Sequence, residues 1–449
     1  MYVVTFYSFK GGVGRSLAAA NIAVSLADAG LQVLLVDFDL EAPGLTYLPA
    51  LAPRRGERRG GVAELIADSW EAKQTQDPKN YLYHPEGFEG RLAVMPAGAV
   101  GTPAFPKAFS RMREFFGAAF DKKQGAPGLT LFRDLRRAWE LLRFDYVVID
   151  SRTGLTDIGG VCTRLLPDLV VLFLGLGEQG LDGIKQVLDQ VGQETLYGDR
   201  LEVRLVAAML PEGEEALLEE RLIHVEHVLG RRPDFFFPIF PPLFLKEDAR
   251  HIEHPRSTLA QEYQKLRDAI REANRWDAGF RLSRARLRVA EADVEPLAEL
   301  VRDLLSSEAD ELPSQSRWEA LSDAAVALLQ APARSIEAKL RAVGLGTSAL
   351  REILARLDRY QYRDLYGSTL NNLANALREL PARDAEERAG SVKEAVGYYK
   401  EALGVYTRDR YPVEWAGTRN NLAGALTELP ARDEEERAGS VKEAVGYYK

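Results

Sequence analysis

The chain has 449 residues, of which 46% are hydrophobic and 28% charged, enough for roughly two to three domains with buried cores. Its formal net charge of -9 argues against nucleic acid as a main partner, and its single cysteine excludes an intrachain disulfide framework. The sequence shows neither a signal-peptide pattern after Met1 nor an apolar run near the ~20 residues of a membrane span. It therefore predicts a cytoplasmic protein that does not bind a membrane.

The first 245 residues alternate β-rich runs with helical patterns, which is typical of a mostly parallel sheet covered by helices on both faces. Several runs are apolar throughout, as expected of strands that are buried on both faces. The expected strands are YVVTFYSF, QVLLVDFDL, RLAVMPAG, FDYVVIDS, LVVLFLGL, EVRLVAAML and FFFPIF. The segment SLAAANIAVSLADAG, from Ser16 to Gly30, predicts the helix that follows the first strand.

The sequence KGGVGRS, residues 10–16, lies between that strand and that helix. A phosphate-binding loop requires converging backbone N–H groups, a helix N-terminus and a cation near the terminal phosphates. The glycines of this loop allow a close approach of the backbone, and the Ser16 hydroxyl is placed to bind Mg²⁺. Arg15 stands at the position usually held by lysine. The pattern predicts a nucleotide site with an altered cation.

Acidic residues follow two of the expected strands. Asp37 and Asp39 end the second strand, and Asp150 ends the apolar run FDYVVIDS. Ligands of open α/β sheets bind at the carboxyl ends of the strands, and a strand-terminal aspartate can hold Mg²⁺ through water. These three acids therefore extend the predicted site, and they are expected, with Ser16, to hold the metal.

Beyond residue 245 the sequence becomes charged and rich in leucine, alanine and arginine, which predicts helices. We expect a helical extension of the first domain over residues 246–312, a helical linker over 313–360 and a repeat region over 361–449. In the repeat region, Tyr366 to Lys400 matches Trp415 to Lys449 nearly letter for letter, 49 residues apart. One helix pair cannot bury its apolar face alone, so such units stack. The repeat resembles the tetratricopeptide family, and the chain is expected to continue beyond Lys449.

Taken together, KGGVGRS, VLLVDFDLEAPG, LAVMPAG and FDYVVIDSRTG resemble the deviant Walker-A ATPases of the ParA/MinD class, in particular a bacterial variant subgroup with KGGVGR. The resemblance covers residues 1–245 and implies the P-loop NTPase fold, ATP with Mg²⁺, slow hydrolysis and a nucleotide-dependent homodimer. It implies that Lys10 reaches the phosphates of the partner subunit, that Asp39 positions the attacking water, and that Asp37 supports the Mg²⁺ water shell. The nucleotide contacts it implies are Lys10, Gly11, Gly12, Val13, Gly14, Arg15, Ser16 and Leu17.

Two arginines depart from the pattern of the class. Arg15 replaces a compact ammonium with a planar guanidinium, a change that can preserve nucleotide binding and slow hydrolysis. Arg152, in the turn SRTG after Asp150, either acts near the γ-phosphate or pairs with an acid such as Asp157. The choice of ATP over GTP rests on the resemblance alone.

Other features have simpler interpretations. The histidine pairs His224/His227 and His251/His254 are spaced for one face of a helix, and no third ligand is evident in the sequence. Cys162 is expected to be buried and inert, and the basic run at residues 54–61 to be a solvated loop.

Three functions remain compatible with the sequence. The first is an ATP-dependent switch whose repeats bind a protein partner, in bacterial signalling or defence. The second is a non-hydrolysing scaffold that nucleotide stabilises, and the third is a partitioning or positioning ATPase.

Overall fold

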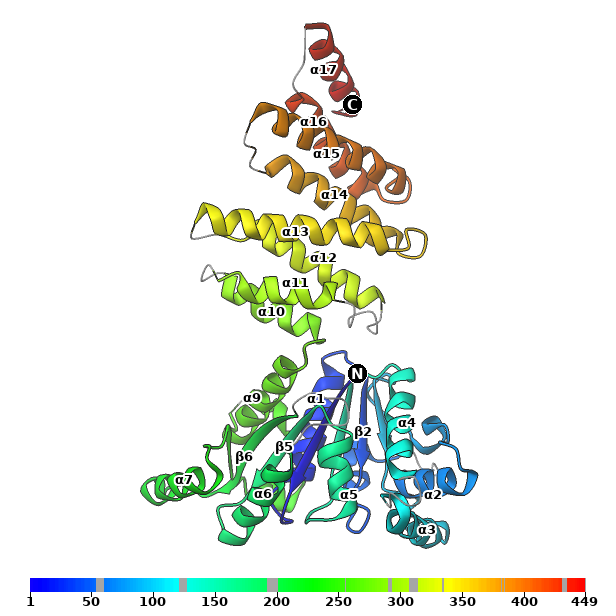
Figure 1. Cartoon of the computed structure of the whole chain (residues 1–449), viewed down its shortest axis with the longest axis vertical. Coiled ribbons are helices and arrows are strands. Elements are labelled where there is room, and N and C mark those ends of the chain that lie inside the picture. The colour runs from blue at the N-terminus through cyan, green and yellow to red at the C-terminus, as the bar shows by residue number, and fades with distance from the viewer. Residues whose placement is uncertain are drawn as a thin grey trace. The chain divides into compact units, whose positions relative to one another are not determined.

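The structure is a computed structural model that describes residues 1–53, 60–120, 127–191, 201–254, 256–289, 293–306, 314–332, 335–380, 382, 384–429 and 434–448. The contacts between residues divide the chain into two compact units, Met1–Asn274 and Arg275–Lys449 (Figure 1). The basic run at residues 54–59 and the segment around Leu312 lie outside the described residues. In the described part of the chain, no helix is long and apolar enough to cross a membrane.

The N-terminal unit is built on a sheet of seven strands, which all pair in parallel in the order β3-β2-β4-β1-β5-β6-β7. All seven expected strands are present. They are β1 Tyr2–Ser8, β2 Val33–Asp37, β3 Leu92–Met95, β4 Tyr146–Asp150, β5 Leu169–Leu174, β6 Glu202–Leu210 and β7 Phe235–Pro238. Because β1 lies between β4 and β5, the loop that leaves it emerges at the centre of the sheet.

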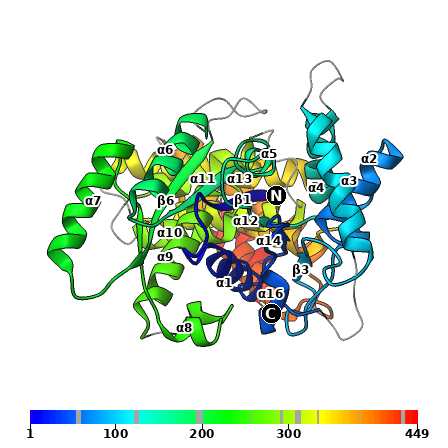
Figure 2. The same ribbon diagram turned by 90° about the horizontal axis from the view of Figure 1, so that it is seen from below.

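The alternation of side chains along each strand divides the core between the two faces of the sheet. Val4 and Phe6 of β1 pack on one face with the helices α1 (Arg15–Asp28) and α9 (Thr258–Ala273). Val3 and Tyr7 belong to clusters on the opposite face. Figure 2 shows α1 and α9 on the side of the sheet opposite to α5 and α6. The expected fold class, a parallel sheet with helices on both faces followed by a helical region, is confirmed.

The remaining helices of this unit are mostly amphipathic or short. They are α2 Val62–Ala72, α3 Ala104–Ala119, α4 Pro127–Leu141, α5 Asp157–Gly160, α6 Glu178–Val191, α7 Glu215–Leu229 and α8 Pro242–Leu245. Within residues 246–312, expected to be helical, the first long helix begins only at Thr258, where Ser257 caps it by accepting a hydrogen bond from the Ala260 N–H. The described residues 248–254, 256 and 257 instead form turns that contain the short 3₁₀ helix His251–Glu253.

The C-terminal unit consists of helices within its described residues. They are α10 Ala278–Val289, α11 Glu295–Leu305, α12 Ser314–Gln330, α13 Ile336–Arg356, α14 Arg363–Glu379, α15 Ala385–Val405, α16 Pro412–Glu428 and α17 Glu434–Tyr448. The helices α12, α14 and α16 start at residues 314, 363 and 412, and α13, α15 and α17 start at 336, 385 and 434. The period of 49 residues therefore extends to the α12–α13 pair, within the segment expected to be a linker.

Packing in the three helix pairs follows the same period. Leu328, Leu377 and Leu426 occupy equivalent positions and are all buried in one hydrophobic cluster. An ion pair also recurs between successive pairs, from Arg351 to Glu394 and from Lys400 to Glu443, with N–O distances of 2.9 Å in both cases. The sequence signal for the first pair is APARS at residues 331–335, which parallels the LPARD of the later repeats. We infer that α12–α13 is a diverged copy of the same unit.

Substitution of Gly61 tests how tightly the start of α2 packs against the residues that follow β3 in the chain. A Cβ atom at Gly61 would lie 1.9 Å from the carbonyl oxygen of Pro96, which is backbone and cannot move aside cheaply. We expect Gly61→Ala to lower the free energy of unfolding by about 3 kcal/mol or more. Gly117→Ala, on the exposed face of α3 with open space around it, is the control and should be neutral or slightly stabilising. Urea denaturation measures both, and equal effects would contradict the packing described.

Candidate functional site

The loop between β1 and α1 lies open to solvent. Gly12 and Gly14 have φ values of 78° and 76°, in the left-handed region that favours glycine, and Gly14 caps α1. A Cβ atom at Gly11, Gly12 or Gly14 would meet nothing within 4 Å. The loop therefore presents bare backbone at a helix N-terminus, the arrangement that suits a phosphate group.

The other expected contact residues differ in exposure. Lys10 is exposed and has no hydrogen-bond or ion-pair partner among the described residues. Val13 and Leu17 are partly buried against the core around β1, and Ser16 is half-buried. Of the side chains in the loop, Lys10 is thus the one that can reach outward.

The Arg15 guanidinium points inward, to the ends of β2 and β4, and is 5% exposed. Its Nε donates to Asp150 Oδ1 at 2.6 Å, and its NH2 donates to Asp39 Oδ2 at 3.0 Å. It also donates to the hydroxyls of Ser8, at 3.3 Å, and Ser16, at 3.2 Å. Burial lowers the pKa of Arg15, but the two ion pairs outweigh this effect and raise it. Arg15 is therefore the cation that neutralises the acids of the site.

Asp37 and Asp150 lie side by side at the carboxyl ends of β2 and β4, in direct register and fully buried. Burial raises the pKa of each, and for Asp150 the charge of Arg15 opposes that rise. Asp37 Oδ1 accepts the backbone N–H of Asp39 at 3.0 Å. The second oxygens, Asp37 Oδ2 and Asp150 Oδ2, have no hydrogen-bond partner among the described residues. Two orphaned carboxylate oxygens beside an open phosphate loop fit the needs of a hydrated divalent cation.

Arg152 pairs with Glu41, not with Asp157, which the sequence offered as one possible partner. Its NH2 donates to Glu41 Oε2 at 2.6 Å, and the two side chains are 26% and 50% exposed. The pair joins the loops that follow β4 and β2. Sequence reasoning overlooked Glu41, although this acid lies only two residues after Asp39. A half-exposed pair contributes about 0–1 kcal/mol to stability, so Arg152 can exchange its partner at little cost.

Behind the site, Cys162 is buried, and burial raises the pKa of its thiol to about 12. The thiol is therefore protonated at neutral pH and is a poor nucleophile, as expected from the sequence.

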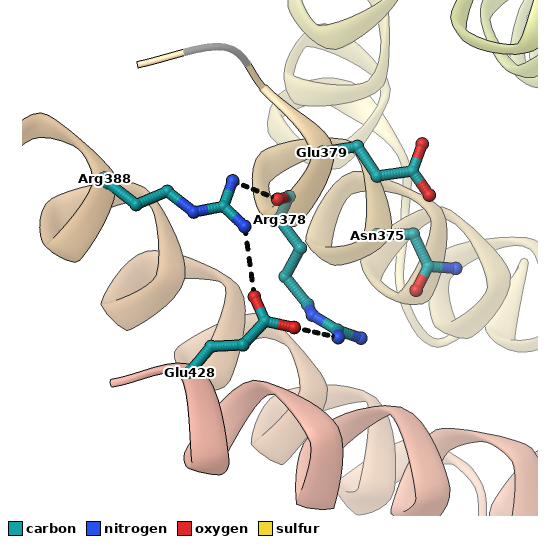
Figure 3. Close-up of a pocket in the computed structure, with 5 residues that line it drawn as sticks. All are labelled: Asn375, Arg378, Glu379, Arg388 and Glu428. Carbon is teal, nitrogen blue, oxygen red and sulfur yellow. Dashed lines mark hydrogen bonds and ion pairs between the residues drawn. The ribbon is translucent and has the colours of Figure 1, made fainter. Parts of the chain in front are cut away.

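A second polar site lies at the junction between repeats in the helical unit. Glu428 of α16 faces two arginines, Arg378 of α14 and Arg388 of α15, and pairs with both (Figure 3). Arg388 also donates to the backbone carbonyls of Arg378 and Leu380. These three side chains, with Asn375 and Glu379, line a cavity of about 400 Å³. Beside it, Asn421 donates to Asn371 Oδ1 across the repeats at 3.3 Å.

Comparison with known proteins identifies a relationship over most of the chain. The model of the family described as "CobQ/CobB/MinD/ParA nucleotide binding domain" matches residues 4–377. The succinoglycan biosynthesis transport protein ExoP of Rhizobium meliloti is 32% identical over 155 residues, 33% of this chain and 15% of its own length. The septum site-determining protein MinD of Helicobacter pylori is 46% identical over 52 residues, 12% of this chain and 19% of its own. The chain thus spans less than a fifth of either relative.

Among solved structures, the septum site-determining protein MinD of Pyrococcus horikoshii, complexed with Mg-ADP, aligns with 60% of this chain and 95% of its own length. The sequence identity is 19% and the TM-score 0.42.

Removal of the Arg15 side chain tests its role as the buried counterion. Arg15→Ala leaves Asp150 and Asp39 without their shared cation, so we expect the nucleotide-free chain to lose about 3–5 kcal/mol of stability. Arg111→Ala is the control, because the Arg111–Glu71 pair is half-exposed and contributes about 1 kcal/mol at most. Chemical denaturation without nucleotide measures both. A loss in Arg15→Ala no larger than in the control would contradict the role assigned to Arg15.

Proposed function

Because the chain belongs to the CobQ/CobB/MinD/ParA nucleotide-binding family, whose model matches residues 4–377, we propose that it is a Mg-ATP-dependent molecular switch. Its N-terminal unit binds and slowly hydrolyses ATP, and its helical unit binds a protein partner. The observation that carries the proposal is the open glycine loop beside two buried carboxylates with orphaned oxygens. A deviant Walker-A loop of the KGGVGR type and tetratricopeptide-like repeats are parts of the same proposal.

The residues that would hold Mg²⁺, in part through water, are Ser16, Asp37, Asp39 and Asp150. When bound, the ion neutralises charge on the β- and γ-phosphates. Asp39 is 15% exposed, at the mouth of the site, where it can orient a water molecule. Asp150 and Asp37 are fully buried and hold their oxygens in fixed positions at the strand ends. In this arrangement, Arg15 and the metal compete for the same carboxylates.

The dimer is proposed from the position of Lys10. The side chain is exposed, and no partner among the described residues holds it to its own subunit. A second subunit facing the loop would bring its phosphates within reach of this ammonium group. The state of the nucleotide would then control association, and the repeats would recruit or release the protein partner. A bacterial signalling or defence system is the setting that we propose for such a switch.

A variant that cannot hydrolyse ATP tests the switch. We expect Asp39→Ala to form a dimer in analytical ultracentrifugation with saturating Mg-ATP and to remain monomeric with ADP. Adding Lys10→Ala to Asp39→Ala should abolish the dimer, because the ammonium group that reaches the phosphates of the second subunit is lost. Adding Lys185→Ala, on the exposed face of α6, should leave the dimer intact. Binding of a fluorescent ATP analogue is measured in parallel, since Asp39 also contacts Arg15. A monomer that binds Mg-ATP at saturation would refute the switch.

The Arg152–Glu41 pair provides a test of catalysis. If Arg152 acts on the γ-phosphate, Arg152→Ala should lower phosphate release by about tenfold or more. Glu41→Gln breaks the same pair but keeps the arginine, so phosphate release should be maintained or increased. Neither variant should change the free energy of unfolding by more than about 1 kcal/mol. Equal losses of activity in the two variants would assign the pair a structural role only.

The second candidate function is a scaffold that binds nucleotide without turnover. The ion pairs of Arg15 favour it, because they occupy the carboxylates on which hydrolysis would depend. Steady phosphate release that Asp150→Ala abolishes would exclude the scaffold. Partitioning or positioning, the third function, has only the relationship to septum-site proteins in its favour.

A further inference from the structure

The turn before α9 brings together three side chains that none of the proposals above uses. Asp248, His251 and His254 each offer one ligand atom, and these atoms all lie within 4.8 Å of one another. His254 Nε2 is 3.3 Å from Asp248 Oδ2, and the rings of His251 and His254 have centroids 5.0 Å apart. In the described part of the chain, this is the one group of three or more histidine, cysteine or acidic residues that meets this criterion. We propose that it is a binding site for a divalent transition metal of the Zn²⁺ class.

The sequence suggested helix-surface histidines and no third ligand, and the structure corrects both points for this pair. His251 is 3% exposed and lies in a 3₁₀ turn, and His254 follows it outside any helix. Asp248 precedes the turn and faces back to His254. Three residues within seven positions of the chain thus converge because the backbone folds back on itself there.

The ligand types favour zinc over magnesium or calcium. Two imidazoles and one carboxylate form a mixed nitrogen and oxygen set, which suits Zn²⁺, Ni²⁺ or Cu²⁺, whereas Mg²⁺ and Ca²⁺ prefer oxygen alone. With bonds of about 2.0–2.2 Å, ligand atoms around a tetrahedral zinc ion lie about 3.4 Å apart. Closure from the observed separations requires shifts of no more than about 1.5 Å. His254 and Asp248 are 60% and 37% exposed, so such shifts are open to them.

The backbone of the turn is already held in place. Asn21 of α1 donates its side-chain amide to the Asp248 carbonyl at 2.9 Å and accepts the Ile252 N–H at 2.9 Å. Nε2 of His251 lies 2.8 Å from Ser257 Oγ, the kind of oxygen contact that orients a ligating imidazole. If Nε2 keeps this contact, His251 would bind the metal through Nδ1.

The charge around the site also permits a cation. Arg250, which lies between Asp248 and His251 in the sequence, directs its guanidinium to Asp28 and Glu253 instead. Asp248 Oδ1 accepts a hydrogen bond from the backbone N–H of Arg250 at 2.9 Å, which leaves Oδ2 facing His254. Three protein ligands leave a fourth position to water or to a further ligand, as in open zinc sites.

The chain contains its own control. The sequence HVEH at residues 224–227 has the same spacing as HIEH at 251–254, but it lies on the long helix α7, where His224 pairs with Glu178. Only one other histidine, His84, exists in the chain. Spacing alone would give both pairs equal affinity, whereas the proposed site depends on the third ligand, Asp248.

The test uses the full-length chain without an affinity tag, stripped of metal and free of nucleotide. Co²⁺ is titrated and followed by its visible ligand-field absorption, and Zn²⁺ is then added as a competitor. We expect one Zn²⁺ per chain, with affinity lowered by more than about tenfold in His254→Gln and in Asp248→Asn. His227→Gln should bind like the unmodified chain. Because His254 and Asp248 are at the surface, both variants should fold, which circular dichroism verifies.

Absence of stoichiometric binding would overturn the proposal. An equal loss in His254→Gln and His227→Gln would do the same, because it would show surface histidines acting without a site. Unchanged affinity in Asp248→Asn would remove the third ligand and with it the site described.

Discussion

The buried contact between Arg15 and the carboxylates of Asp150 and Asp39 is the interaction on which the centre of the N-terminal unit depends. Parallel pairing of β2 with β4 places Asp37 beside Asp150, and the chain returns Asp39 to the same edge. Three acids in so little space need a cation, since a buried carboxylate without a counterion costs several kcal/mol. The fold provides that cation from the first residue of α1.

This contact also gives a physical reason for arginine at this position. Its guanidinium reaches two carboxylates and two hydroxyls at once, with donors on three nitrogens. A lysine ammonium is a single point charge and could not span the same set in one plane. In the nucleotide-free chain, Arg15 thus takes the place that a divalent cation would take in the proposed complex. Binding of the nucleotide and its metal would therefore have to displace the Arg15 guanidinium from these carboxylates. Lys10 is exposed and has no such contact to break.

The sequence predicted the architecture well where burial dictates the residue types. The seven strands were recognisable because the central ones are apolar on both faces, and the loop because its glycines and acids lie at strand ends. Glu41 escaped prediction because its contact with Arg152 joins loops 111 residues apart. The helical composition beyond residue 246 does not produce a helix before Thr258, because the turns and the cap that Asn21 and Ser257 hold override it there. Contacts that depend on tertiary placement left no local signal.

The helical unit shows how a period can persist after sequence similarity has faded. APARS, the spacing of buried leucines and the Arg351–Glu394 ion pair link α12–α13 to the later pairs, and the helix boundaries keep the 49-residue period. In a stacked array, helix length, the buried positions and the contacts between neighbours decide whether the next pair can dock. The recurring Arg351–Glu394 and Lys400–Glu443 pairs are such contacts, with the type of cation exchanged and its position retained. At other positions the residue type changes: Thr427 stands one period after Arg378, and a threonine cannot repeat the ion pair that Arg378 makes with Glu428 of the next helix pair.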